Sequence, residues 1–176
     1  CIFLFMNEFK YSPIEIEFLQ ECHRINEDNA PNVGSTEFED FVELVSNSDF
    51  NLCVARGGLP IGYVICFQDK EPTNSYMEKI KHKNFKEIKK RVSSCLYIDR
   101  IAIDKNYRKN KLATGLYLRV IDFAKNNSID NLAAEINLLP SINTPSFNFH
   151  QSFEFFEIDK IKYASDYEVS LQKKIL

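Results

Sequence analysis

The chain has 176 residues, a formal net charge of −3, and only five glycines and six prolines. These values fit one globular domain and exclude a collagen-like or largely disordered protein. The slightly acidic balance gives no sign of a nucleic-acid-binding protein, and the apolar run "CIFLF" is far too short for a signal peptide or a membrane span.

The cysteines indicate a protein of a reducing compartment. They lie at positions 1, 22, 53, 66 and 95, without a Cys-x-x-Cys pair, so the sequence predicts no metal site. Most lie in apolar runs, as buried thiols do. We therefore expect a cytoplasmic protein without a membrane partner, with a lipid-anchored Cys1 as an alternative. Met6 is interpreted as the start, which makes residues 1–5 non-native or upstream and residues 6–176 a single domain.

The first half of the chain predicts two helices and a β-hairpin. Apolar residues repeat at helical spacing within residues 14–29, and Ser12 before Pro13 is a helix-start signal. Ser35 or Thr36 is expected to cap a second helix over residues 37–47. Two apolar runs on either side of the turn "GGLP" predict a hairpin over residues 51–68.

The second half predicts helices and strands that alternate. Strand 95–103, "CLYIDRIAI", is the most apolar and is expected to be central. The predicted helices are 74–94, 111–127 and 143–153. The other predicted strands are 132–138, 155–163 and 167–175. This order of elements predicts a mixed α/β protein in which helices cover a sheet.

A basic loop joins strand 95–103 to helix 111–127. It carries Arg108, Lys109 and Lys111. Free N–H groups and the helix dipole favour an anion at a helix start, and the cations add charge and hydrogen-bond donors. The loop therefore predicts a phosphate site, with a solvated basic turn as the alternative.

The same loop resembles motif A of the GNAT superfamily of acyl-CoA N-acetyltransferases, Arg/Gln-x-x-Gly-x-Gly/Ala. Arg108 and Ala113 match, and Lys111 replaces the middle glycine. If the position needs a positive φ, Lys111 weakens anion binding; if its φ is helical, the change costs little. Residues 143–158 resemble motif B, Asn-x-x-Ser-x-x-Phe-(Tyr/His)-x-x-x-Gly-Phe. The matches are Asn143, Ser146, Phe149, His150 and Phe155, with Glu154 at the glycine position.

Two further stretches, "RINEDNAPNVGS" and "LYIDRIAI", resemble a bacterial subgroup of predicted GNAT acetyltransferases. The resemblance implies a mostly antiparallel central sheet, flanked by helices and splayed between its fourth and fifth strands, here 95–103 and 131–138. Acetyl-CoA would lie in the split, with its pantetheine arm along strand 95–103 and its pyrophosphate on the basic loop. The implied cofactor residues are Ile101, Ala102, Ile103, Arg108, Lys109, Asn110, Lys111, Leu112, Ala113, Thr114, Asn143 and Ser146.

Two side chains are candidates for catalysis. Glu135 lies in the apolar strand "LAAEINL", where loss of water would raise its pKa and suit it to act as a base. The alternatives are a solvent-facing carboxylate or an ion pair. By the resemblance, His150 stands where many family members have a tyrosine that acts as general acid; the alternative is a packed histidine between Phe149 and Phe153.

Other charged residues are open to two interpretations each. Asp99 and Arg100 could form a structural ion pair or shape the acceptor pocket. The Lys-rich segment 74–92 could attract an acidic acceptor or RNA, although a solvated helix face is the simpler interpretation. By the resemblance, this segment is an insertion near the acceptor site, where Tyr76 and Phe85 would line a pocket. We name no partner for His23 or His82.

The sequence thus predicts an acetyl-CoA-dependent N-acetyltransferase that acts by direct attack of a small-molecule or amino-acid-like primary amine on the thioester. No metal, nucleic acid or membrane is expected, and a homodimer is an option. A CoA-binding sensor or regulator is the alternative that Lys111 favours, and an RNA-associated protein is a third hypothesis.

Overall fold

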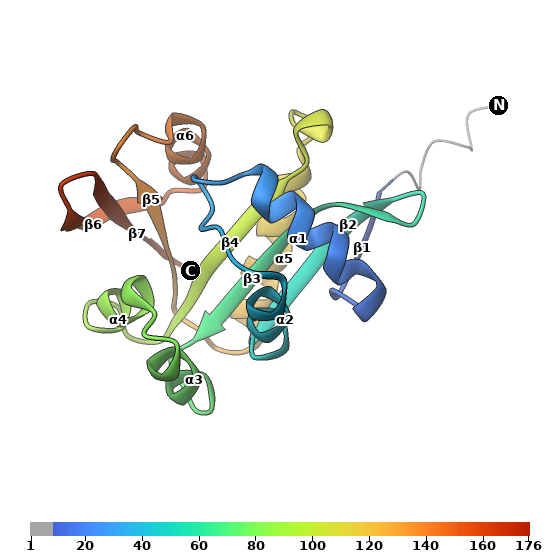
Figure 1. Ribbon diagram of the computed structural model, residues 1–176. Helices are drawn as coiled ribbons and strands as arrows, with labels where there is room; N and C mark the ends of the chain where they lie inside the picture. The colour runs from blue at the N-terminus through green and yellow to red at the C-terminus, as the bar shows by residue number, and fades with distance from the viewer. Residues whose placement is uncertain (1–8) are drawn as a thin grey trace. The chain divides into compact units, whose positions relative to one another are not determined.

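The computed structural model describes residues 9–176, so the expected start at Met6 and the alternative for Cys1 lie outside the described residues. The strands are β1 Lys10–Ser12, β2 Phe50–Arg56, β3 Leu59–Gln68, β4 Cys95–Ile103, β5 Asn131–Asn137, β6 Phe156–Ala164 and β7 Tyr167–Ile175. The α-helices are α1 Leu19–Asp28, α2 Phe38–Ser46, α3 Thr73–Lys79, α4 Lys83–Lys89, α5 Leu112–Asn126 and α6 Thr144–Ser152. Two short 3₁₀ helices are η1 Ile16–Phe18 and η2 Lys105–Tyr107. Figure 1 traces these elements along the chain.

The strands form one seven-stranded sheet in the order β1-β2-β3-β4-β5-β7-β6. β4 and β5 are parallel, whereas β5 with β7 and β6 with β7 are antiparallel. The β4–β5 register runs only from Cys95↔Asn131 to Tyr97↔Ala133. β5 instead pairs with β7 along its whole length, as far as Asn137↔Val169. The mixed sheet is confirmed, and β4 and β5 stop pairing where the splay was expected.

The chain folds into two compact units. The first comprises the described residues up to Ile65 together with Arg100–Val120, and the second comprises Cys66–Asp99 together with Ile121–Leu176. In the first unit, Cys22 and Ile25 of α1 are fully buried, and the ring of Phe41 packs edge-on against Tyr63 at 5.5 Å. The cysteines at positions 22, 53, 66 and 95 are all buried, as predicted.

The predicted start of the first helix is wrong. Ser12 is the last residue of β1 and lies opposite Cys53 of β2, and the Ile14 N–H donates to Asn51 Oδ1 at 2.9 Å. A strand of three residues is too short to show the alternation that predicts strands. The prediction that Ser35 or Thr36 caps the second helix is also wrong. Glu37 is the N-cap of α2, and its side chain makes no capping hydrogen bond.

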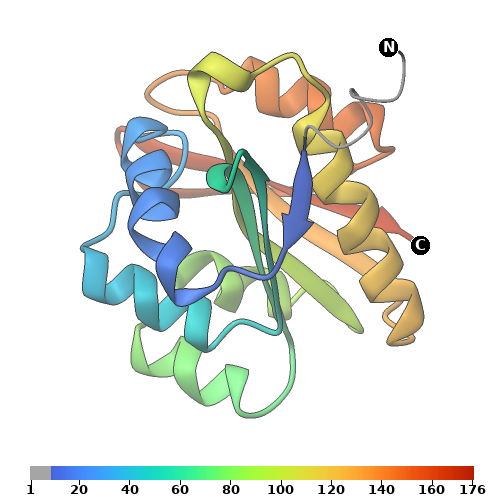
Figure 2. The same cartoon turned by 90° about the vertical axis from the view of Figure 1, so that its right-hand side faces the viewer.

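The first turns of α5 lie beside β1, as Figure 2 shows. The Arg119 guanidinium lies 3.7 Å from the centre of the Tyr11 ring. An added Cβ at Gly115 would come within 2.1 Å of the Tyr11 hydroxyl, so only glycine allows this close approach. Gly115 therefore serves the packing of the first unit.

The second unit corrects the prediction of one helix over residues 74–94. The chain forms α3 and α4 with a break at Lys81, whose φ is +54°. His82 then begins α4 as its N-cap, because its Nδ1 accepts the Phe85 N–H at 3.2 Å. Tyr76 and Phe85 are both buried in this unit, and their apolar spacing gave no sign of the break.

Candidate active site

The basic loop of the first unit gathers positive charge and hydrogen-bond donors at the start of a helix. η2 follows β4 and is capped by Asp104, whose carboxylate accepts the Asn106 N–H at 2.9 Å. α5 then starts at the buried Leu112, while residues 108–111 are exposed. The first N–H groups of a helix have no partner within the helix. These groups and three exposed cations are what a pyrophosphate requires.

Two lysines of this loop have a left-handed backbone. The φ angles are +66° at Lys109 and +57° at Lys111, and the Lys111 carbonyl accepts the Gly115 N–H at 3.0 Å. The position of the missing motif glycine therefore does need a positive φ, the less favourable of the two outcomes considered for Lys111. An L-residue pays roughly 1–2 kcal/mol for this conformation.

A pair of variants separates the charge of Lys111 from its backbone strain. We expect Lys111→Gly to be more stable than Lys111→Ala by about 1 kcal/mol, because both lose the ammonium but only alanine keeps the Cβ. Denaturant unfolding of the two proteins measures the difference. Equal stabilities would mean that the left-handed conformation costs nothing at this position.

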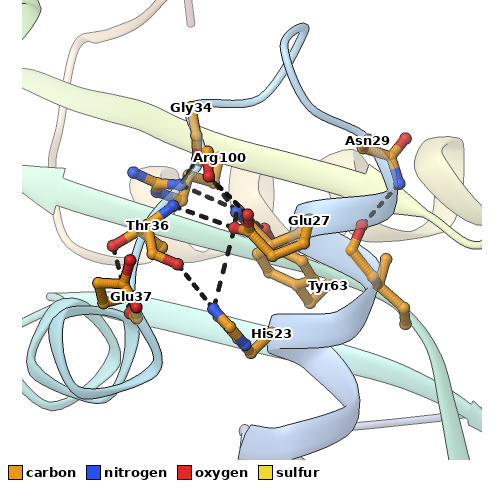
Figure 3. A network of polar contacts seen from close by, with 11 residues as sticks. His23, Glu27, Asn29, Gly34, Thr36, Glu37, Tyr63 and Arg100 are labelled. Carbon is orange, nitrogen blue, oxygen red and sulfur yellow. Dashed lines mark hydrogen bonds and ion pairs between the residues drawn. The ribbon is translucent and has the colours of Figure 1, made fainter.

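The loop that follows α1 is held by a polar network in the first unit. Figure 3 shows Arg100, Glu27 and His23 gathered at this loop, close to Gly34 and Thr36. Arg100 donates to Asn26 Oδ1 at 2.9 Å and to the Gly34 carbonyl. Glu27 accepts the Thr36 N–H at 3.0 Å, and His23 Nε2 lies 2.7 Å from the Thr36 carbonyl oxygen. Arg100 therefore helps to hold this loop in place.

The same loop reaches the basic loop through Asn29. Its side-chain oxygen accepts from the Arg108 guanidinium at 2.9 Å. Because a guanidinium carries five N–H donors, this bond leaves Arg108 able to bind a phosphate. The network therefore orients the arginine of motif A.

Glu135 of the second unit has a carboxyl group that is partly removed from water. Glu135 as a whole is half-buried, but its Oε2 atom is inaccessible to water and has no hydrogen-bond partner in the structure. Burial, with the negative charge of Asp99 as the next cause, raises the pKa of Glu135 to about 7; the nearby Tyr97 hydroxyl, His82 and the Asn84 amide oppose the shift.

Asp99 lies beside Glu135 and is itself well held. Its side chain is only 4% exposed, and its Oδ1 is 2.8 Å from His82 Nε2 and 3.2 Å from the Tyr97 hydroxyl. Tyr97 and Asp99 are two apart on β4, so they share a face of the strand. That spacing could have revealed the pair from the sequence. No local signal could have brought His82 to them.

The β6–β7 hairpin adds two tyrosines to this cluster. The rings of Tyr163 and Tyr167 are stacked with their centres 5.2 Å apart, and the Tyr163 hydroxyl donates to Asn84 Oδ1 at 2.8 Å. Burial, together with nearby negative charge, raises the pKa of both tyrosines, so they stay neutral around physiological pH.

The motif B residues lie in helix α6 and at its two ends. Asn143 is the N-cap, and its side-chain oxygen accepts the Ser146 N–H at 3.3 Å. His150 is buried, with its Nδ1 2.8 Å from the Ser146 carbonyl oxygen and its ring edge-on to Phe155 at 5.0 Å. Burial lowers the pKa of His150, and the bond to Ser146 opposes this only partly. Glu154 lies just past the helix with a φ of +63°, so it shapes the turn that ends α6.

Residues 16–155 match the model of the acetyltransferase (GNAT) family. The chain belongs to this family. A search of curated proteins by sequence finds no match for the chain.

Solved GNAT structures share the fold at low identity. The ribosomal-protein-S18-alanine N-acetyltransferase of Escherichia coli is 15% identical, with a TM-score of 0.69 over 95% of this chain and 93% of that one. Ard1 of Thermoplasma volcanium is 10% identical, with a TM-score of 0.76 over 96% and 98%. NAA60 of Arabidopsis thaliana in complex with acetyl-CoA is 17% identical, with a TM-score of 0.72 over 96% and 99%. At these identities the similarity establishes the fold alone.

Each unit of this GNAT chain gathers one set of the predicted residues. The first unit contains Ile101, Ala102 and Ile103 together with the basic loop, and the second contains Glu135, Asn143, Ser146 and His150. Four members of the Glu135 cluster were not predicted from the sequence, and no partner was predicted for His82. The missed residues are Asn84, Tyr97, Tyr163 and Tyr167.

Proposed function

We propose that this GNAT protein transfers an acetyl group from acetyl-CoA to a primary amine of a small-molecule or amino-acid-like acceptor. The observation that carries the proposal is the carboxyl group of the half-buried Glu135. Its Oε2 is inaccessible and unpartnered, and burial and Asp99 raise its pKa to about 7. A carboxylate with a pKa near the working pH is well suited to remove a proton. Tyr97 and Asn84 lie beside it as neutral hydrogen-bonding groups.

The chemistry assigned to Glu135 is the removal of one proton. An alkylammonium cannot attack a carbonyl, because its nitrogen has no lone pair. Ionised Glu135 takes this proton, becomes a neutral carboxylic acid, and leaves a neutral amine that attacks the thioester directly. Acetyl-CoA supplies the activated acetyl group. An N–H of β4 would stabilise the negative charge that develops on the carbonyl oxygen.

The cofactor assignment rests on the basic loop and on β4. Arg108, Lys109 and Lys111 are exposed beside the N–H groups of Leu112, Ala113 and Thr114, and this donor set fits a pyrophosphate. Asn110 uses its amide to bond the Tyr107 carbonyl at 3.0 Å, which shapes the loop. The main chain of Ile101–Ile103 remains the proposed partner of the pantetheine arm.

His150 retains its proposed role as general acid under one condition. Because a carbonyl oxygen only accepts, Nδ1 carries the proton that it shares with Ser146, and a neutral ring then has no proton to give from Nε2. Donation to the leaving thiolate requires the imidazolium, which burial disfavours. A packing role explains the buried ring equally well.

Known structures of the same fold support an amine acceptor. The Escherichia coli enzyme is named for an alanine of ribosomal protein S18, and Naa50 of Arabidopsis thaliana was solved with the bisubstrate analogue CoA-Ac-MVNAL. Peptides therefore belong beside small amines among the acceptors to be tested. Acceptor pockets vary within a fold, so the fold alone does not select between them.

The alternative function is a CoA-binding sensor or regulator. The positive φ at Lys111 favours it, since a strained lysine replaces the glycine of motif A. Among residues 9–176, no helix is long and apolar enough to cross a membrane, and no group of three or more potential ligands could hold a metal. The cytoplasmic location, the single domain and the homodimer stay predictions.

Two measurements test the proposal. Calorimetric titration with acetyl-CoA should give micromolar binding, about −8 kcal/mol. Release of free CoA should then rise when a panel of small amines and short peptides with free N-termini is added. Binding without transfer to any member would favour the sensor. Absence of binding would contradict both functions.

A further inference from the structure

A second carboxylate lies in the Glu135 cluster and has no part in the proton transfer proposed above. Asp99 is on β4, two residues after the last β4–β5 pair, Tyr97↔Ala133. Its side chain is 4% exposed, so it is almost completely removed from water. A buried charge of this kind is costly unless hydrogen bonds satisfy it, and two donors meet its Oδ1.

The first donor is His82, and its tautomer follows from the geometry. Its Nδ1 accepts the Phe85 N–H at 3.2 Å, so in the neutral ring the proton is on Nε2. Nε2 lies 2.8 Å from Asp99 Oδ1 and donates to it. The ring also packs edge-on against Tyr97, with centres 5.8 Å apart. The N-terminus of α4 thus holds His82 in the one orientation that fixes Asp99.

The second donor is Tyr97, whose single hydroxyl proton faces two carboxylates. The hydroxyl oxygen is 3.2 Å from Asp99 Oδ1, and Glu135 is also within its reach. When the proton points to Asp99, the Tyr97 oxygen can accept from Glu135 only if Glu135 is protonated. A Tyr97 proton donated to Glu135 would stabilise the ionised form of Glu135. Because Asp99 accepts that proton, it weakens this opposition to proton uptake by Glu135.

We propose that Asp99, held by His82, is a positioning residue for the base Glu135, and that α4 thereby belongs to the working site. Asp99 orients Tyr97 and places a second negative charge beside Glu135, and both effects favour proton uptake by Glu135. The same charge favours an acceptor that arrives as an ammonium. This inference rests on the proposed function, because it assigns Glu135 the role of base.

The groups that face Glu135 come from four elements. They are Tyr97 and Asp99 of β4, His82 and Asn84 at the start of α4, Tyr163 of β6 and Tyr167 of β7. The tyrosines stay neutral at physiological pH because burial raises the pKa of each. Asp99 and His82 are therefore the neighbours whose charges can shift the titration of Glu135.

The test measures Glu135 directly and needs no acceptor. The full chain is labelled with ¹³C-glutamate, the Glu135 carboxyl signal is assigned by its loss in Glu135→Gln, and its chemical shift is followed against pH. Asp99→Asn, which keeps the shape of the side chain, should lower the titration midpoint by about one pH unit. Asp166→Asn removes the same charge from the exposed turn between β6 and β7 and should leave the midpoint unchanged.

A second pair of variants tests His82. In a His82→Ala background, Asp99→Asn should shift the midpoint less than half as far, because an unanchored Asp99 can turn away. If Asp99→Asn fails to fold, Asp99→Ser replaces it. The inference would be overturned if Asp99→Asn left the Glu135 midpoint unchanged. It would also be overturned if Asp99→Asn shifted the midpoint equally in the wild-type and His82→Ala backgrounds. Asp99→Asn could lower the Glu135 midpoint as expected in a protein that does not bind acetyl-CoA. That result would overturn the proposed function but leave the effect of Asp99 on Glu135 established.

Discussion

Replacing Glu135 with glutamine should lower kcat by about a hundredfold or more, and it should also make the protein more resistant to heat above neutral pH. The two effects have one cause. A base that works near neutral pH has to be kept in surroundings that penalise its charge, and the folded protein carries that penalty whether or not substrate is present.

The pH dependence follows from the raised pKa of Glu135, which is about 7 in the folded protein against an ordinary value of 4.5. The folded state therefore holds a proton that the unfolded state has lost. The stability contributed by this proton is complete below about pH 4.5 and is lost as pH rises through 7. Because glutamine stays neutral, Glu135→Gln should raise Tm by about 5 °C at pH 8.5 and change it little at pH 4.5.

Activity should show the same titration in the wild-type protein. Because the ionised form of Glu135 is the base, kcat/KM should increase with pH up to about 7 and then level off. Glu78→Gln, an exposed change in α3 of the same unit, is the matched control and should alter neither Tm nor rate. If Glu135→Gln keeps more than a tenth of the activity and loses stability at every pH, Glu135 has a structural role instead.

Replacing Arg108 with alanine should weaken acetyl-CoA binding about tenfold, equivalent to about 1.4 kcal/mol. Arg108 is exposed, lies four positions before the first residue of α5, and donates to Asn29 Oδ1 at 2.9 Å. Its charge adds to the positive end of the helix dipole, so the variant loses both attraction to a pyrophosphate and two-point hydrogen bonding. Isothermal titration calorimetry with acetyl-CoA measures the change.

The control for Arg108 lies at the far end of α5, the helix that follows the basic loop. Lys125 is an exposed cation in the last turn of α5, and Lys125→Ala makes the same change in net charge. It should leave the affinity for acetyl-CoA within about twofold of wild type, since a charge beyond a Debye length is largely screened. Equal effects of the two variants would mean that the loop attracts the ligand only through the net charge of the protein.

Periodicity and motif spacing determined the type and order of most elements. The hairpin, the central strand Cys95–Ile103, α5, β5, α6 and the two closing strands agree with the sequence pattern to within a few residues. Long apolar repeats are reliable because burial repeats with the period of the element. The prediction failed at β1 and at Lys81, where a three-residue edge strand and a single left-handed residue leave no periodic trace.

The sequence by itself determined the family and nominated Glu135, because both depend on residues that are close together along the chain. Only the tertiary structure decided how Glu135 is surrounded. Asp99 and His82 are 17 positions apart, and Tyr163 lies 79 positions from Asn84. The pKa of a carboxyl group depends on burial and on charges that are near in space, and a linear pattern contains neither. For the same reason, only the fold revealed the positive φ of Lys111 and the hydrogen bond from Arg108 to Asn29.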